Sequence, residues 1–156
     1  MDEREFVEEA GLVFEQRGMP RMAGRIIGWL LICDPPQQTM QDLTEALQTS
    51  KSSISTATRL LIQFGFIQRV SLPGERRDYY RMDADFWARA FENGVQQFVN
   101  FRQLAEKGLA LLAGETPERK ARLEDMYDTS LFMEQEYPAL LERWHQLRKQ
   151  RVDTIK

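Results

Sequence analysis

The sequence of 156 residues predicts a mainly α-helical fold with one small β-hairpin. Over most of the chain, apolar residues recur every three or four positions, which is the spacing of one helix face. Between residues 66 and 82, two short strand-like stretches flank a Pro-Gly turn signal. Beyond residue 85, two long apolar seams step by three and four, a pattern typical of helices that pack on other helices.

Four helices are expected before the hairpin, because turn residues and helix caps bound each amphipathic stretch. We place them at residues 2–17, ended by Gly18; 20–32, ended by Asp34-Pro35-Pro36; 40–48, begun by Thr39; and 51–64, begun by Ser50 and ended by Gly65. The second stretch is apolar on several sides, so we expect that helix to be buried.

The hairpin and the long C-terminal helices complete the expected fold. The expected elements are strands at residues 66–71 and 78–82, a helix over residues 85–113, and a last helix that starts at Pro117. The turn between the strands carries Arg76 and Arg77, which makes a basic tip. Pro138 is expected to kink or interrupt the last helix, because proline removes a backbone donor.

The composition limits the classes of partner and of chemistry. With 21 basic and 24 acidic side chains the net charge is -3, so the whole molecule is not a general polyanion binder. Residues 37–82 carry six basic and four acidic side chains, a local excess of +2 that suits a nucleic-acid surface. One cysteine and one histidine exclude an internal disulfide and any zinc site built from several Cys and His ligands of one chain.

Neither an enzyme nor a membrane protein is expected. The sequence shows no nucleophile motif, phosphate-binding loop, metal cluster or base beside a nucleophile, so we expect no catalytic residue, cofactor or metal. No apolar stretch approaches the ~18 residues of a membrane span, and the chain begins with acidic residues. We therefore expect a soluble, unexported protein.

The two short helices before the hairpin, together with the hairpin itself, form a winged helix-turn-helix pattern. Small hydroxyl side chains let the second helix enter the major groove of DNA closely, and the positive end of its dipole attracts phosphate. The residues expected to contact DNA are Ser50, Lys51, Ser52, Ser53, Ser55, Thr56 and Arg59 on this helix, and Arg76 and Arg77 on the wing. The alternative is a capped surface helix whose hydroxyls face water, with ordinary charges at a hairpin tip.

The chain resembles MarR-type winged-helix transcription regulators from about residue 18 to residue 82. The resemblance is carried by residues 39–55 (TMQDLTEALQTSKSSIS), Leu60-Leu61, Gly65-Phe66-Ile67 and Pro73-Gly74-Glu75-Arg76-Arg77. Residues 18–30 (GMPRMAGRIIGWL) are similar to the GbsR-like branch, which is associated with choline or glycine betaine metabolism. The resemblance implies a cytoplasmic homodimer that binds a palindromic operator and represses; some members of the family also respond to small molecules.

With this resemblance, the chain divides into three regions. Residues 1–17 form an N-terminal helix for dimerisation, residues 18–82 the winged helix-turn-helix DNA-binding domain, and residues 83–156 a helical dimerisation region. A two-fold dimer places two recognition helices about one DNA turn apart, roughly 34 to 36 Å. The residues expected in the dimer interface are Phe6, Phe98, Phe101, Leu112, Met133, Tyr137, Leu140 and Trp144. The alternative is a self-contained helical lobe.

An aromatic group could serve an effector. Trp29, Phe86, Trp87 and Phe91 could line a pocket that attracts a quaternary ammonium ligand, although aromatic residues at helical spacing are usually core, and we favour core. For Cys33 we favour a core position over a redox sensor, and for His145 a surface or interface position. The expected partners are double-stranded DNA and a second copy of the chain, with a small-molecule effector left open.

The function that these features favour is that of a homodimeric transcription regulator that binds specific DNA. The competing function is that of a winged-helix protein-interaction module within a larger complex, which the acidic overall balance permits. Salt dependence of duplex binding separates the two, because DNA binding releases counterions and weakens steeply as salt rises.

Overall fold

The structure is a computed structural model that describes the backbone of residues 1–154 and the side chains up to residue 151. The chain divides into two compact units, residues 1–86 and the residues from Trp87 onward, and each unit is described by itself. No helix among the described residues is long and apolar enough to cross a membrane.

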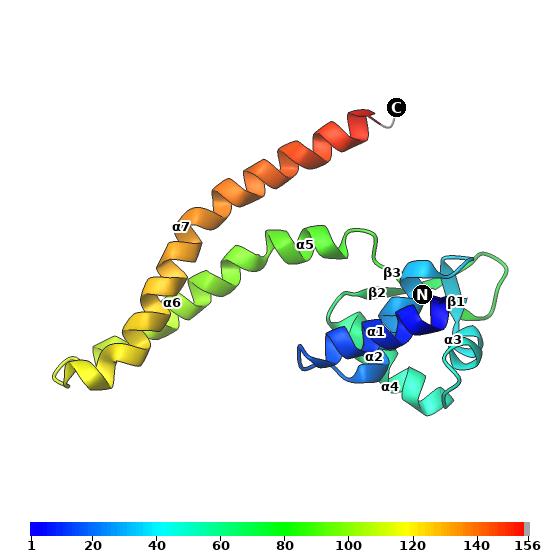
Figure 1. The fold of residues 1–156 in the computed structure, drawn as a ribbon, viewed down its shortest axis with the longest axis horizontal. Coiled ribbons are helices and arrows are strands. Elements are labelled where there is room, and N and C mark those ends of the chain that lie inside the picture. Colours follow the sequence, from blue (N-terminus) through cyan, green and yellow to red (C-terminus); the bar gives the residue numbers. More distant parts are fainter. Residues whose placement is uncertain (155–156) are drawn as a thin grey trace. The chain divides into compact units, whose positions relative to one another are not determined.

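The first unit contains four helices and three strands (Figure 1). They are α1 (Glu3–Glu15), α2 (Arg21–Ile32), β1 (Gln37–Thr39), α3 (Met40–Ala46), α4 (Lys51–Gln63), β2 (Ile67–Ser71) and β3 (Asp78–Met82). The four helices expected from the sequence lie within two residues of their predicted ends. The fold class, mainly helical with a small antiparallel sheet, is therefore confirmed.

Side-chain caps set where these helices begin. The carboxylate of Asp2 accepts a hydrogen bond from the Glu5 N–H at 2.8 Å, and the Glu5 carboxylate accepts one from the Asp2 N–H at 2.9 Å. At α3 the Thr39 hydroxyl and the Asp42 carboxylate make the same reciprocal pair. Such a capping box satisfies two donors that the first turn of a helix leaves without partners.

The sheet has three antiparallel strands in the order β1-β3-β2, so the expected two-stranded hairpin was incomplete. β2 and β3 form the hairpin with Ile67 opposite Met82, and β1 adds Thr39 opposite Tyr79 on the other edge of β3. β1 is polar and three residues long, so it has no alternating pattern by which the sequence could reveal a strand. It forms because β3 offers it an open edge.

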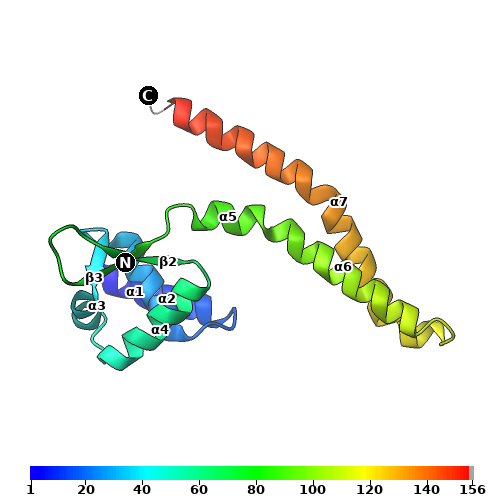
Figure 2. The same ribbon diagram turned by 180° about the vertical axis from the view of Figure 1, so that it is seen from behind.

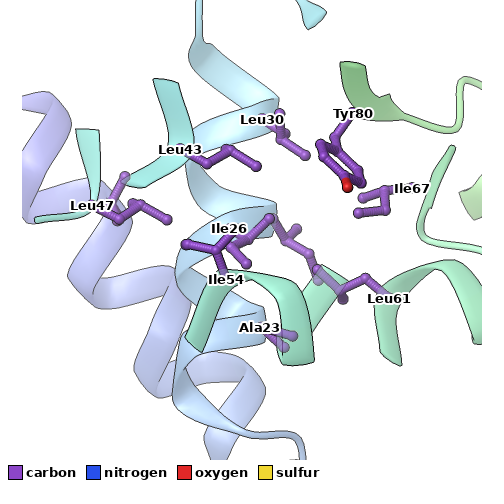
Figure 3. Packing of buried hydrophobic residues seen from close by; sticks show 12 residues of the cluster. Ala23, Ile26, Leu30, Leu43, Leu47, Ile54, Leu61, Ile67 and Tyr80 are labelled. Atoms are coloured by element: carbon purple, nitrogen blue, oxygen red, sulfur yellow. The ribbon is translucent and has the colours of Figure 1, made fainter. Parts of the chain in front are cut away.

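The core of the first unit is built from α2, α3, α4 and the sheet (Figure 3). Its fully buried side chains include Ile26, Ile27, Leu43, Ile54, Leu61 and Ile67. The burial expected for α2 is confirmed except at its C-terminal end, where Leu31 is 48% exposed. α1 packs closely on α2 because Gly28 lacks a side chain: a Cβ there would lie 2.7 Å from the Cβ of Ala10.

The second unit is a helical hairpin of α6 (Gly94–Leu111) and α7 (Pro117–Thr154), joined by residues 112–116 (Figure 2). The single helix predicted over residues 85–113 is wrong, because the chain forms a separate short helix, α5 (Phe86–Glu92), before α6. Asn93 and Gly94, both poor helix formers, lie at the division. The Tyr137 hydroxyl of α7 donates a hydrogen bond to the Phe91 carbonyl at 3.0 Å, and a Cβ on Gly94 would collide with that hydroxyl.

α7 continues through Pro138, so of the two expected outcomes, a kink or an interruption, the interruption does not occur. The helix changes direction along the orange part of its ribbon (Figure 1). A proline removes one backbone hydrogen bond, and a helix of 38 residues retains the bonds on either side. α7 is also held to α6 near this point, because the Arg102 guanidinium forms an ion pair of 2.6 Å with the Glu134 carboxylate.

Candidate nucleic-acid interface

α4 has one buried side and one polar, exposed side. Ile54, Ala57, Thr58 and Leu61 are buried against the core. Thr58 is the one hydroxyl of the helix that faces inward, and it donates to the Ile54 carbonyl at 2.9 Å. On the outer side, Ser50, Lys51, Ser52, Thr56 and Arg59 are exposed, while Ser53 and Ser55 are half-buried. α4 contains no acidic residue, so nothing on this helix opposes a polyanion.

Some of the polar side chains on the outer side of α4 are partly engaged by their own helix. The Ser50 hydroxyl accepts a hydrogen bond from the Ser53 N–H at 3.2 Å and therefore acts as the N-cap. The Arg59 Nε donates to the Ser55 carbonyl at 3.3 Å, which holds the side chain along the helix. The two Nη groups of Arg59 have no partner among the described residues, and they are left for a ligand.

The wing is the turn at residues 72–77 between β2 and β3. Gly74 has a φ of +83°, a conformation that favours glycine, and it turns the chain. Arg76 and Arg77 are both exposed, and neither has an ion-pair partner among the described residues. Asp78 is instead 3.5 Å from Arg69, so the nearest carboxylate of β3 is paired elsewhere.

The structure brings the wing and the start of α4 together at a hollow of about 380 Å³. The hollow is lined by Thr39, Met40, Gln41, Lys51, Arg77, Asp78 and Tyr80. Lys51 and Arg77 come from segments 26 positions apart in the chain and share this one depression. Both cations were expected at the interface, but their proximity was not, and Gln41 was not expected there because α3 was assigned no contact with DNA.

A second hollow, of about 760 Å³, runs along the other flank of α4. It is lined by Pro20, Met22, Ser52, Ser53, Thr56, Ala57, Arg59, Leu60 and Gln63. Ser52, Ser53, Thr56 and Arg59 were expected at the interface, whereas Pro20, Met22 and Gln63 were not. No local signal marks the start of α2 as a neighbour of α4, because only the tertiary packing brings these segments together.

Three of the four aromatic residues expected around an effector have partners inside their own units. The Trp29 indole N–H donates to the Gln38 side chain at 3.2 Å, and Phe86 stacks on Phe66 with ring centroids 3.9 Å apart. Phe91 lies edge-on to Trp144 at 6.0 Å, and Trp87 is 55% exposed. Trp29 also lines a separate pocket of about 490 Å³ with the start of α1 and the end of α3.

The residues expected in a dimer interface range from half-buried to exposed. Phe6, Phe98, Leu112, Met133, Tyr137 and Trp144 are half-buried, and Phe101 and Leu140 are exposed. Tyr137 contacts both Phe91 and Phe98, so part of this set holds the second unit together. Leu104, Leu111 and Phe132 were not in the expected set, and they are exposed by 59%, 85% and 60%.

Cys33 and His145 show no sign of reactive chemistry. Cys33 is half-buried and packs against the core of the first unit. Burial raises the pKa of its thiol and the nearby Asp34 charge adds to the rise, which opposes formation of the reactive thiolate. His145 lies on the surface with its Nε2 3.8 Å from Glu92. No group of three or more metal-ligating side chains occurs in the part of the chain that the structure describes.

A helix-turn-helix, a three-stranded sheet that carries a basic wing, and a cation-bearing recognition helix define a winged-helix DNA-binding protein. Two family models match the chain: that of the MarR family over residues 17–78, and that of MmpR5-like MarR family transcriptional regulators over residues 85–148. The chain belongs to the MarR family of transcriptional regulators. The prediction of this family is confirmed.

Individual relatives agree with this assignment. The chain is 41% identical to the HTH-type transcriptional regulator MmpR5 of Mycobacterium tuberculosis (strain ATCC 25618 / H37Rv) over 145 residues, which are 93% of this chain and 88% of the relative. It is 28% identical over 85 residues to the HTH-type transcriptional repressor OpcR of Bacillus subtilis (strain 168), covering 54% of this chain and 45% of that protein. A crystal structure of a transcriptional regulator with 40% identity superposes with a TM-score of 0.77, covering 94% of this chain and 99% of that one. These relatives are regulators, which agrees with the prediction that the chain is not an enzyme.

Proposed function

We propose that this regulator is a homodimeric repressor that binds a palindromic operator, with α4 in the major groove and the wing on the adjacent DNA backbone or minor groove. The proposed DNA-contacting residues are Ser50, Lys51, Ser52, Ser53, Ser55, Thr56, Arg59, Arg76 and Arg77. The single observation that carries the proposal is the outer side of α4, which is exposed, rich in hydroxyls and cations, and lacks a carboxylate. A polyanion meets there only groups that donate hydrogen bonds or carry positive charge.

The proposed dimer uses the three regions expected from the sequence in two roles. Residues 1–17 and 83–156 provide the interface between the two copies, and residues 18–82 form the DNA-binding domain. The support is the amount of apolar side chain that the second unit leaves exposed, including Phe101 and Leu140 of the expected set. One winged helix reads only a few base pairs, so two-fold pairing is what would give an operator enough length to be specific.

Repression, small-molecule control and a cytoplasmic location complete the proposal. Repression is supported by the name of the OpcR relative, a transcriptional repressor. The effector site expected from the sequence comprises Trp29, Phe86, Trp87 and Phe91; of these, Trp29 lines a pocket of about 490 Å³ between α1, α2 and α3, which supports the site in part. The similarity of residues 18–30 to the GbsR-like branch is retained as part of this proposal. A protein-interaction module is not favoured, because the matched relatives are named as transcription regulators.

The deciding experiment is selection of bound duplexes from a random DNA pool by the full chain. We expect enrichment of a palindrome whose half-sites lie about one helical turn apart, roughly 10 base pairs. The affinity for the selected duplex should fall steeply with salt, by roughly 0.9 in log–log slope for each phosphate contacted. Failure to enrich any sequence, or an affinity that is insensitive to salt, would contradict the proposal.

A further inference from the structure

The hollow between the start of α4 and the wing contains two cations with no anion of their own. Lys51 is the first residue of α4 and Arg77 immediately precedes β3, and both line the same depression of about 380 Å³. Neither side chain has an ion-pair partner in the described part of the chain. The one carboxylate that lines the hollow, that of Asp78, is 3.5 Å from Arg69. Two positive side chains thus line the hollow, and the one carboxylate beside them is paired with a residue outside its lining.

The rest of the lining favours a small, strongly accepting anion. Thr39 and Gln41 are polar, although the Thr39 hydroxyl donates to Asp42 at 2.7 Å and the Gln41 amide donates to Glu45 at 2.8 Å. Besides the Tyr80 hydroxyl, the donors of the lining without a hydrogen-bond partner among the described residues are the two charged ones, the Lys51 ammonium and the Arg77 guanidinium. A guanidinium bonds two oxygens of a phosphate in a fixed geometry, and an ammonium bonds it as a point charge.

We propose that this hollow is a binding site for one phosphodiester of the DNA backbone, held jointly by Lys51 and Arg77. The inference rests on the proposed DNA binding and adds a specific physical link: one phosphate connects the recognition helix to the base of the wing. The shared phosphate fixes the orientation of α4 in the groove, because the helix and the wing grip the same point of the strand. Arg76, which does not line the hollow, grips a different point.

The first test uses the salt dependence of binding to the selected duplex for Lys51→Gln, Arg77→Gln and the double variant. A shared phosphate is counted once, so the double variant should lower the log–log salt slope by about 0.9 per subunit, whereas two separate phosphates would lower it by about 1.8. Each single variant should lower the slope by less than the double variant does. Circular dichroism and thermal melting of each variant serve as controls that its fold is intact.

The second test locates the phosphate with duplexes that carry one neutral methylphosphonate at successive backbone positions. At one position per half-site, the modified duplex should bind wild type, Lys51→Gln and Arg77→Gln with equal affinity, because the phosphate charge that both side chains recognise is gone. Arg76→Gln is the matched control, since it removes a neighbouring wing charge and should still weaken binding to that duplex. Different sensitive positions for Lys51 and Arg77, or a slope change near 1.8, would overturn the proposal while leaving DNA binding intact.

The source of the phosphate is decided by titrating inorganic phosphate into the protein without DNA, with isothermal titration calorimetry as the readout. If the site serves the DNA backbone, a single free phosphate should bind the wild type and the double variant equally weakly, because the other contacts of the duplex are missing. Saturable phosphate binding to the wild type that the double variant loses would assign the hollow to the free anion and refute the proposed role. If no duplex is selected at all, the proposed function itself fails, so the two failures are distinguishable.

Discussion

The two units of the chain differ in how much of their apolar side chains they bury. The first unit encloses a continuous core, in which Ile26, Leu43, Ile54 and Leu61 are fully buried. In the second unit, among residues 87–151, the buried residues are Ala88, Ala105 and Ser130, which are all small. Burial stabilises by roughly 25 cal/mol per Å² of apolar surface, so side chains of this size contribute little. The first unit buries its large apolar side chains within itself, whereas the second leaves several of them exposed.

The largest expected effect comes from making the apolar surface of the second unit charged. Phe101→Glu with Leu140→Glu should convert the proposed dimer to a monomer, because each carboxylate would have to be buried without a partner. Loss of the second recognition helix should weaken operator binding by about 10² to 10⁴-fold. Sedimentation velocity measures the mass and a binding titration measures the affinity.

A matched control adds the same two charges at neighbouring exposed positions. Gln103→Glu with Ala139→Glu should leave both the mass and the affinity close to those of the wild type. If the variant with Phe101→Glu and Leu140→Glu remained a dimer, the interface would have to lie elsewhere on the chain.

The second prediction concerns the core of the first unit. Leu43→Ala leaves a cavity at a position with no solvent exposure, so the free energy of unfolding should fall by about 2 to 5 kcal/mol. Leu31→Ala removes the same atoms from a side chain that is 48% exposed and should cost under about 1 kcal/mol. Urea unfolding at a fixed protein concentration measures both. Equal losses in the free energy of unfolding for the two variants would mean that Leu31 is buried in the proposed dimer. The dimer interface would then include part of the first unit.

The same comparison explains what the sequence could predict. The helices of the first unit were placed within two residues because their caps are local: the Thr39 and Ser50 side chains bond to N–H groups three residues on. The polar face of α4 could be predicted for the same reason, since it follows from the helix period.

What could not be predicted depends on contacts between distant segments. β1 exists only as a partner of β3, and the hollow between Lys51 and Arg77 needs the folded sheet. In the second unit, the division between α5 and α6 coincides with a hydrogen bond to Tyr137, a residue more than forty positions away. An apolar seam with a period of three and four does not reveal which of its side chains face the hairpin and which face outward.

The smallest expected effect tests how far the second unit relies on single polar contacts. Tyr137→Phe removes the hydroxyl that donates to the Phe91 carbonyl and keeps the ring contacts with Phe91 and Phe98. Loss of one such hydrogen bond should lower the free energy of unfolding by about 1 kcal/mol. Tyr127→Phe is the matched control, because no hydrogen bond of the Tyr127 hydroxyl is found among the described residues, and it should be close to neutral. Indistinguishable stabilities of the two variants in urea unfolding would show that α5 is held by its aromatic contacts alone.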